Sequence, residues 1–350
     1  MTGERDTPTR RDFLRQALAV AAGAGLLPVV AGCSSSTPAG NGPADATGAA
    51  KAPASHSGRG AGAFFGRVAR RSDPGVFVSA GHDQARVDEL VQRAVADLVG
   101  VGDPAEAFRA LFDPKDIVAI KVNCLAGPGL SSSPSVVHAL VSGLRGIGIA
   151  HRGIWIFERT TAELKRAGFE PNRYSDNRPR CAGNDELGFE RDLSFSGAVG
   201  SSFANVVARQ ATALINVPVL KDHDLSGVGC GMKNLYGLIH NPNRYHDNNC
   251  DPFIADIAAH PYVRDKLRLV LADALTAQYH GGPARSPAHQ WKPAAVLAAD
   301  DPVALDRLAW ELIEEQRSAH GLPTLAESRR PPRWLETAGA RGLGEHRRDK

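Results

Sequence analysis

The feature that most constrains the fold is a repeated pattern in which a short apolar run ends at polar residues. Each run has the length of a buried β-strand, and segments with helical spacing of apolar residues separate the runs. The alternation predicts an α/β fold with a mainly parallel sheet, helices on both faces and a Rossmann-like layered architecture. The expected strands are Ile117–Val122, Gly153–Phe157, Ala213–Val217, Leu267–Leu271 and Ala294–Ala298.

The helices between these strands are predicted from apolar residues that recur three and four positions apart. Ser133 and Asp301 directly precede two of these segments and are expected to be N-caps. The segment Gly75–Ala80 is expected to be a further strand, whereas residues 170–200 show no clear pattern. The expected helices are Val87–Leu98, Ala105–Phe112, Ser135–Gly146, Phe203–Gln210, Phe253–Ala259 and Pro302–Gln316.

Polar residues directly follow the expected strands. In open parallel sheets, ligands bind at the carboxyl ends of the strands. We therefore expect these side chains to meet at one edge of the sheet and to form a composite site there. The residues are Asn123, Glu158, Lys221, Asp273 and Asp300.

The segment Leu214–His240 contains most of the residues that are candidates for ligand binding or catalysis. Its glycines would let the backbone approach a ligand closely, and a helix that begins near Met232 would direct its first N–H groups toward an anion. The same pattern also fits a tight turn that packs a helix on the sheet. The predicted catalytic residues are His223, Lys221 and Lys233. The predicted ligand-binding residues are Lys121, Asn123, Ser226, Gly227, Gly229, Gly231, Asn234 and Asp273.

Histidines provide candidate general bases or metal ligands. His223 is the strongest candidate because it lies between Asp222 and Asp224, which should raise its pKa and orient its ring. His240, His246 and His280 are further candidates. No pair has the His-x-x-x-His spacing of a helix face, so a metal site would have to combine distant segments. The sequence identifies no cofactor.

The N-terminus predicts export and membrane anchoring. Arg10 and Arg11 form a twin-arginine signature, and an apolar stretch from Ala17 to Ala31 follows it. The stretch ends in Val-Ala-Gly-Cys33, which resembles the lipobox of bacterial lipoproteins. We therefore expect a signal over residues 1–33, lipidation of Cys33, and a mature protein attached to a membrane of the cell envelope. A plain signal peptide is the alternative.

Three further regions complete the expected organisation. Residues 34–62 contain mainly small and polar residues and are expected to be a flexible linker. Residues 63–320 should form the α/β domain. Residues 321–350, rich in Arg and Pro, should form a basic surface tail.

Charge and cysteine content limit the remaining possibilities. The chain has 41 basic and 38 acidic residues, a balance that does not favour a nucleic-acid partner. No cysteine pair has Cys-x-x-Cys spacing, so iron–sulfur and zinc-ribbon motifs are not supported. Either two disulfides of undetermined pairing or buried free thiols are compatible with the remaining cysteines, which are Cys124, Cys181, Cys230 and Cys250.

Several motifs in a fixed order resemble the bacterial and archaeal family called domain of unknown function 362. The resemblance covers about Phe65 to Gln316 and implies a fold and a shared site, without a known reaction. The triplet Glu158-Arg159-Thr160 departs from the pattern expected there, which puts its role in doubt. The motifs are Ile120-Lys121-Val122-Asn123, Lys221-x-His223, Ser226-Gly227-Val228, Met232–Gly237, Gly281-Gly282-Pro283 and Asp301–Asp306.

A looser resemblance to the lactate-racemase family is confined to about Asn216–Gly237. In that family a lysine carries a nickel pincer nucleotide and histidines assist at the metal, so the resemblance implies a metal-cofactor redox or isomerase protein. The leading expectation is instead a site for a small anion, with metal assistance left open. Hydrolysis or group transfer there would use Lys221 and Lys233 electrostatically and His223 as base. A non-catalytic, ligand-binding envelope lipoprotein is the remaining alternative, and the oligomeric state stays open.

Overall fold

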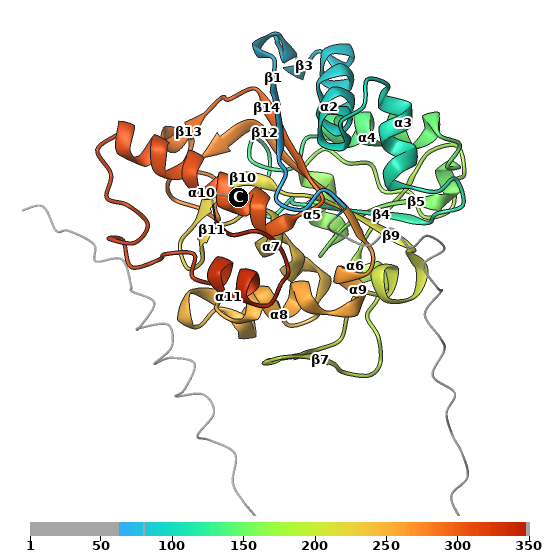
Figure 1. Ribbon diagram of the computed structural model, residues 1–350. Helices are drawn as coiled ribbons and strands as arrows, with labels where there is room; N and C mark the ends of the chain where they lie inside the picture. Colours follow the sequence, from blue (N-terminus) through green and yellow to red (C-terminus); the bar gives the residue numbers. More distant parts are fainter. Residues whose placement is uncertain (1–62, 80, 348–350) are drawn as a thin grey trace, which may run out of the picture. The chain divides into compact units, whose positions relative to one another are not determined.

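A large sheet with mainly parallel central strands organises the structure (Figure 1). It is a computed structural model that describes residues 63–79 and 81–347. The chain divides into two units, Met1–Ala49 and Ala50–Lys350, and every described residue belongs to the second. The predicted signal with Cys33 and the predicted linker lie outside the described residues.

Seven strands, in the order β1-β14-β12-β9-β4-β5-β6, form the main path of this sheet in the described part of the chain. Neighbours from β12 through β9, β4 and β5 to β6 pair in parallel. β14 is antiparallel to both β12 and β1. The strands are β1 Ala69–Ser72, β4 Val118–Val122, β5 Ile154–Glu158, β6 Arg180–Gly183, β9 Ala213–Val217, β12 Leu267–Gln278 and β14 Ala295–Ala299.

A further strand carries two of the predicted site residues beyond the end of β9. After Pro218 the chain forms β10 (Val219–His223), which pairs in parallel with the second half of β12. β10 then turns into β11 (Gly227–Val228), its antiparallel partner. Lys221 and His223 therefore belong to a strand, whereas the sequence predicted a loop there.

Helices cover both faces of the sheet, as predicted, because the buried strands alternate their side chains between two hydrophobic cores. Ile120 and Ile215 join the core under α2, α3 and α4, whereas Ala119 and Leu214 join the core on the other face. Figure 1 shows these three helices together on one side and α7, α8 and α11 on the other. The helices are α2 Gln84–Val99, α3 Pro104–Leu111, α4 Pro134–Gly146, α5 Thr161–Arg166, α6 Asn184–Leu187, α7 Gly231–Asn234, α8 Phe253–Ala259, α9 Pro261–Arg264, α10 Pro302–Ala319 and α11 Trp334–Ala340.

Three expectations about strands need correction. In the described part of the segment Gly75–Ala80, only Phe77–Val78 (β2) is a strand, and it pairs with Gly81–His82 (β3) in a separate two-stranded sheet. The strand expected to end at Leu271 continues to Gln278, so Asp273 lies within β12. β14 runs against its neighbour β12, so Asp300 at its end lies at the amino edge of the parallel strands rather than with Asn123. Smaller strands are β7 Ser194–Ser196, β8 Val199–Ser201 and β13 Gln290–Trp291.

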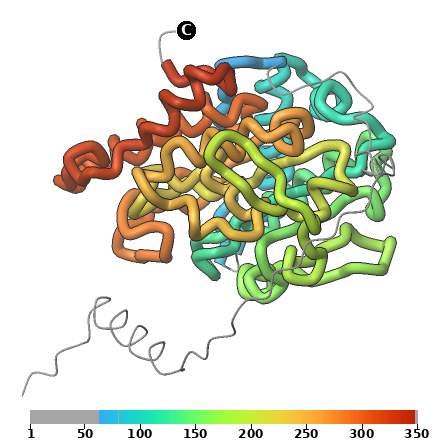
Figure 2. Tube along the Cα trace, turned by 90° about the horizontal axis from the view of Figure 1, so that it is seen from below, coloured from blue at the N-terminus to red at the C-terminus, as the bar shows by residue number. Residues whose placement is uncertain are grey.

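The C-terminal segment is only in part the surface excursion that its Arg and Pro content suggested. Residues 319–329 are largely exposed, whereas α11 packs against α8 and α10 (Figures 1 and 2) and its Trp334 is fully buried. Arg330 donates to the carboxylate of Asp222 on β10 at 2.8 Å. The Trp334 side chain donates to the carbonyl oxygen of Ser226 at 3.0 Å. The basic residues of this segment therefore help to hold the strand that carries Lys221.

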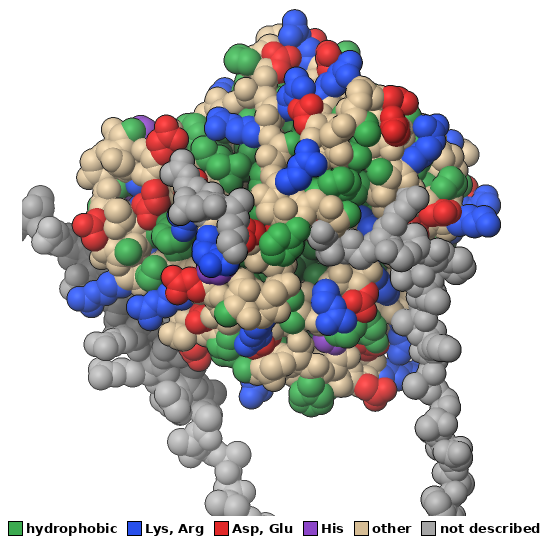
Figure 3. All heavy atoms as spheres, in the orientation of Figure 1, with side chains coloured by type: hydrophobic (Ala, Val, Ile, Leu, Met, Phe, Trp, Pro, Cys, Tyr) green, Lys and Arg blue, Asp and Glu red, His purple; other side chains and the backbone are tan. Residues whose placement is uncertain are grey.

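Charges are mixed on the surface that Figure 3 shows, where basic and acidic side chains are interspersed. This distribution agrees with the small net charge of +3. Among the described residues, no helix is both long enough and apolar enough to cross a membrane.

Candidate functional site

A buried ion pair lies where β4 and β5 end. The Lys121 ammonium lies 2.9 Å from the Glu158 carboxylate, and both side chains are almost completely buried. Glu158 also accepts the backbone N–H groups of Arg159 at 2.7 Å and Cys124 at 3.0 Å. The carboxylate is therefore satisfied by three donors, as a buried charge requires. Sequence reasoning left the role of Glu158 in doubt, although an acid at the end of an apolar strand was the available signal.

Three asparagines connect this ion pair to the neighbouring segments. The side-chain oxygen of Asn234 accepts from Lys121 at 3.2 Å and from the Asn123 amide at 3.0 Å. Asn234 in turn donates to Asn216 of β9 at 2.7 Å. Asn216 was missed, and its signal was a single polar residue inside a buried apolar strand. These bonds fix the orientation of both amides: the oxygen of Asn123 faces Lys221, and the oxygen of Asn234 faces Lys121 and Asn123.

Lys221 approaches this network from β10. Its ammonium donates to the side-chain oxygen of Asn123 at 2.9 Å. Among the described residues, no carboxylate lies within 4.0 Å of this nitrogen. The Lys221 side chain is 2 % exposed, and burial lowers its pKa to about 8. Lys121 and Lys221 thus share the Asn123–Asn234 pair, as the predicted composite site requires.

Lys233 adds a second cation without a carboxylate partner in the described structure. Its nitrogen lies 3.3 Å from Nε2 of His246 and 3.7 Å from the centre of the Tyr236 ring. Burial lowers its pKa to about 8, and the positive charges of Lys221 and Arg159 act in the same direction. As a whole residue Lys233 is partly exposed, unlike Lys121 and Lys221.

His223 is uncharged near neutral pH, which corrects the expectation of a raised pKa. Burial lowers its pKa to about 4 and outweighs the opposing effect of Asp224. Its Nδ1 accepts the backbone N–H groups of Leu225 at 3.1 Å and Ser226 at 3.3 Å. These bonds place the proton of the neutral ring on Nε2. The Asp224 carboxylate lies 3.1 Å from Nδ1 but is largely exposed, so water screens it.

The segment that carries His246 has an unusual backbone. Asn248, Asn249 and Cys250 are consecutive non-glycine residues with positive φ, at 49°, 57° and 65°. Such residues cost about 1–3 kcal/mol each and concentrate at functional sites. The Asn249 side chain ties the turn to the carbonyl oxygens of Leu225 and Arg329. The surrounding structure thus stabilises this strained turn, which follows His246, the residue that contacts the Lys233 amine.

The glycine-rich loop is occupied by the protein itself. The Asp306 carboxylate accepts the N–H groups of Gly231 at 2.6 Å and Met232 at 2.7 Å. The four-residue helix α7 therefore already has an internal carboxyl group at its first turn, although burial raises the pKa of Asp306 to about 7. Gly227 has a φ of 75°, and a Cβ there would lie 2.3 Å from the Arg330 carbonyl oxygen. Gly229 donates its N–H to the Lys221 carbonyl oxygen. These glycines serve close packing, which was the alternative interpretation of the loop.

Two other predicted residues also have internal roles. The Ser226 hydroxyl is fully buried and donates to the carbonyl oxygen of Val228 at 2.9 Å. Asp273 accepts the N–H of Ser133, the N-cap residue of α4, at 2.7 Å and that of Leu275 at 3.0 Å. Burial raises the pKa of Asp273. Neither side chain has a hydrogen bond to the lysines or asparagines of the site.

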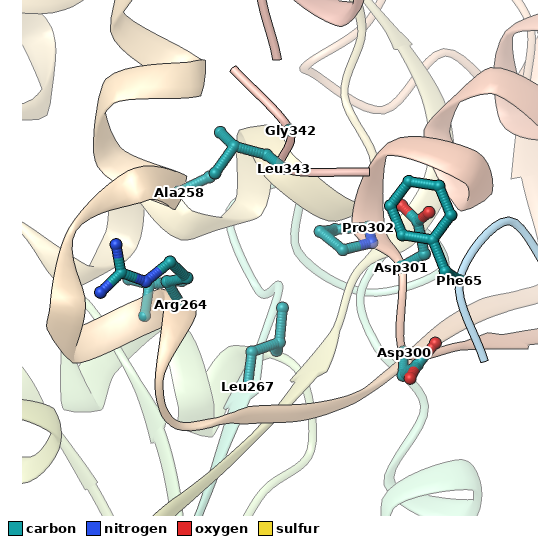
Figure 4. Close-up of a pocket in the computed structure, with 10 residues that line it drawn as sticks. Phe65, Ala258, Arg264, Leu267, Asp300, Asp301, Pro302, Gly342 and Leu343 are labelled. Carbon is teal, nitrogen blue, oxygen red and sulfur yellow. The ribbon is translucent and has the colours of Figure 1, made fainter. Parts of the chain in front are cut away.

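A cleft of about 170 Å³ lies at the amino edge of the sheet, away from the lysines (Figure 4). Phe65 lies near Asp301 at one end, and Arg264 lies at the other. Both carboxylate oxygens of Asp301 are engaged, because one accepts two N–H groups of α10 and the other accepts those of Gly66 and Glu345. Asp301 is therefore the N-cap that the sequence predicted.

Metal ligation and disulfide formation find little support in the geometry. Within residues 63–79 and 81–347, no group of three or more His, Cys, Asp or Glu residues is arranged to hold a metal ion. A metal-assisted reaction therefore has no ready ligand set in this part of the chain. Cys124, Cys181, Cys230 and Cys250 are buried free thiols.

Comparisons with known proteins identify a family. A family model described as "Domain of unknown function (DUF362)" matches residues 118–311, more than half of the chain. A crystal structure of a protein from Thermotoga maritima is similar at 12% sequence identity and a TM-score of 0.39. The match covers 69% of this chain and 60% of that one. No curated protein matches.

Proposed function

The chain belongs to the domain of unknown function 362 family, and we propose that its site at the carboxyl ends of the strands binds a small organic anion. The observation that carries this proposal is the pair of ammonium groups on Lys221, which is buried, and Lys233, which is partly exposed as a residue; among the described residues neither has a carboxylate oxygen within 4.0 Å. Lys121 provides the contrast, because the Glu158 carboxylate contacts it at 2.9 Å. A desolvated cation with no carboxylate in contact is costly, and a bound carboxylate or phosphate would supply that contact.

The surrounding groups suit a small anion with further polar atoms. Arg159 lies close enough to lower the pKa of Lys233. Asn123 offers an amide, and the neutral His223 offers an N–H at Nε2. These donors could bind an anion and stabilise negative charge that develops on it, which would support group transfer or hydrolysis. The glycines are left out of the proposed site because their N–H groups and close approaches serve internal contacts.

Calorimetric titration with inorganic phosphate and oxalate tests the proposal. Lys221→Met and Lys233→Met should each weaken binding by roughly tenfold to a hundredfold, the loss expected for one hydrogen bond to a charged group. Lys266→Met is the matched control. Lys266 is also buried with a pKa lowered to about 8, but it lies at the amino edge of the sheet and donates to the Val207 carbonyl oxygen. Unchanged affinity in both site variants, or no binding by the unaltered protein, would contradict the proposal.

We also propose that the protein is exported by the twin-arginine route and anchored to a membrane of the cell envelope through a lipid on Cys33. The support is the order Arg10-Arg11, apolar stretch and Val-Ala-Gly-Cys33 in the sequence. Mass spectrometry of the mature N-terminal peptide should find a diacylglycerol-modified Cys33. Cys33→Ala should move the protein from the membrane fraction to the soluble fraction. An unmodified Cys33 in membrane-bound protein would refute this anchor.

A further inference from the structure

The Lys233 amine is placed as a nucleophile rather than as a charge alone. We propose that Lys233 forms an imine with an anionic carbonyl compound, of which a 2-oxo acid is the simplest, while Lys221 holds the carboxylate. The inference rests on the proposed anion site and names the class of molecule that would occupy it. Four features of the structure support it: accessibility, a proton acceptor, neighbouring cations and an enforced backbone turn.

Accessibility separates Lys233 from the two other lysines of the site. Lys121 is 1 % exposed and Lys221 is 2 % exposed, and each donates to a side-chain oxygen of the asparagine pair. Lys233 is partly exposed as a residue, and its nitrogen lies 3.3 Å from the ring nitrogen of His246. A carbonyl carbon can therefore approach the Lys233 nitrogen without breaking the buried network.

His246 is suited to move the protons of imine formation. Its pKa is lowered, mainly by burial and then by Lys233, so its ring is neutral near pH 7 and can accept a proton from the amine. The Lys233 nitrogen attacks the carbonyl carbon, a C–N bond forms, and the carbonyl π electrons move to oxygen. One N–H proton passes through His246 to that oxygen. The second N–H proton goes to the hydroxyl group as it leaves, and the products are an imine and one water.

The surrounding charges favour a free amine as well as an anionic partner. Lysine nucleophiles are activated by desolvation and by an adjacent cation. Lys233 has both conditions, because it is desolvated and because Lys221 and Arg159 lie near it. With a pKa of about 8, roughly one-tenth of Lys233 is neutral at pH 7, against about one part in three thousand for an ordinary lysine. The Tyr236 face, 3.7 Å away, favours the ammonium and works against this gain.

The strained turn Asn248–Cys250 fits a role in positioning His246. Three successive left-handed residues are unfavourable, yet Asn249 ties them to two other segments of the chain. The turn lies directly after His246 and Asp247. A strained backbone at this position is consistent with a site whose groups must keep a defined geometry.

Reductive trapping with pyruvate and sodium cyanoborohydride, followed by peptide mapping, tests the inference on the whole protein. We expect the adduct to form at Lys233 at least about tenfold faster than at the exposed Lys115 and Lys165, in line with the larger free-amine fraction. Lys266, whose pKa is also lowered to about 8 but which is buried and donates to a backbone carbonyl oxygen instead of a histidine, should stay unmodified. The rate should increase as the pH rises toward about 8, because the attacking amine must be neutral. Oxalate should protect Lys233, and acetone, which lacks the carboxylate, should react slowly.

The outcomes separate this inference from the proposed anion site. Oxalate binding without an adduct at Lys233, or an adduct spread evenly over exposed lysines, would overturn the inference and leave the anion site standing. Failure of both oxalate binding and trapping would overturn both. Lys233→Arg keeps the charge and should retain oxalate binding while losing the adduct. His246→Gln should slow trapping in the variant that still binds oxalate; an unchanged rate would exclude His246 as the proton carrier.

Discussion

Substitutions of the buried pair Lys121 and Glu158 should have strongly non-additive effects on the free energy of unfolding. Their charged atoms lie 2.9 Å apart, which corresponds to a Coulomb attraction of about 6 kcal/mol at an effective dielectric constant of about 20. Most of that attraction offsets the cost of removing two charges from water. Loss of one partner leaves the other charge buried, so each single substitution should lower the free energy of unfolding by about 3–5 kcal/mol.

The two single substitutions should differ. Glu158→Gln removes the charge and also turns an amide NH₂ toward a backbone N–H, either that of Cys124 or that of Arg159. Lys121→Met leaves Glu158 with both of those N–H donors, so we expect it to cost about 1 kcal/mol less than Glu158→Gln. The double variant removes both charges and should cost about as much as Glu158→Gln alone. The coupling free energy should therefore equal the loss in Lys121→Met, about 3–4 kcal/mol.

Urea unfolding of the four proteins measures this cycle. Arg307 and Glu311, which form a partly exposed pair at 3.0 Å on α10, provide the control cycle. Their coupling should be about 0.3–0.5 kcal/mol, as is usual for such helix pairs. If the losses in the Lys121 and Glu158 variants add to within about 0.5 kcal/mol, the two charges do not support each other and the description of the network is wrong.

Three further predictions follow from the site and its scaffold. The pKa of Lys221 is lowered from 10.5 to about 8, so between these pH values the unfolded chain binds more protons than the folded one. The free energy of unfolding should therefore rise by roughly 2–4 kcal/mol from pH 8 to 10.5. Unfolding measured as a function of pH should show a smaller rise in Lys221→Met. Gly227→Ala should lower the free energy of unfolding by more than about 2 kcal/mol, because Gly227 has a φ of 75° and an added Cβ would clash with the Arg330 carbonyl oxygen. Gly102→Ala is the control: an added Cβ there meets no atom within 4 Å, so the urea midpoint should change little. Trp334→Ala should cost about 3–5 kcal/mol in the same assay, and a loss below about 1 kcal/mol would restore the idea of a loose C-terminal tail.

The sequence predicted the central part of this site because parallel strands have a simple geometry. Lys121 and Asn123 were predicted from their places in and directly after β4. Lys221 was predicted from its place at the end of a later apolar run. Since the carboxyl ends of such strands meet at one edge, the shared Asn123 contact was within reach of sequence reasoning. The same rule failed for Asp300, because a single sequence does not reveal that β14 runs antiparallel to β12.

The glycine loop and His246 show what the sequence alone could not supply. The loop pattern was compatible with an anion, and the place of that anion is taken by the carboxyl group of Asp306, which lies 75 positions after Gly231 in the chain. Only the packing of α10 against α7 brings that carboxylate to the loop. His246, which contacts Lys233, directly precedes a turn of left-handed residues that has no periodicity to detect. His223, in contrast, was correctly placed at a strand end, but its pKa depends on burial that neighbouring sequence charges did not reveal.

The distribution of charge around the three lysines distinguishes a scaffold from a binding surface. If all three ammonium groups served only to stabilise the fold, a carboxylate beside each would be the favourable arrangement, as Glu158 is beside Lys121. Instead the sheet edge supplies neutral oxygens and ring atoms to Lys221 and Lys233, groups that orient a cation without cancelling its charge. An anion that binds there is attracted by both ammonium groups at once, and because it binds only the folded state it stabilises that state. The cost of leaving two buried cations unneutralised is therefore the source of the affinity that we propose.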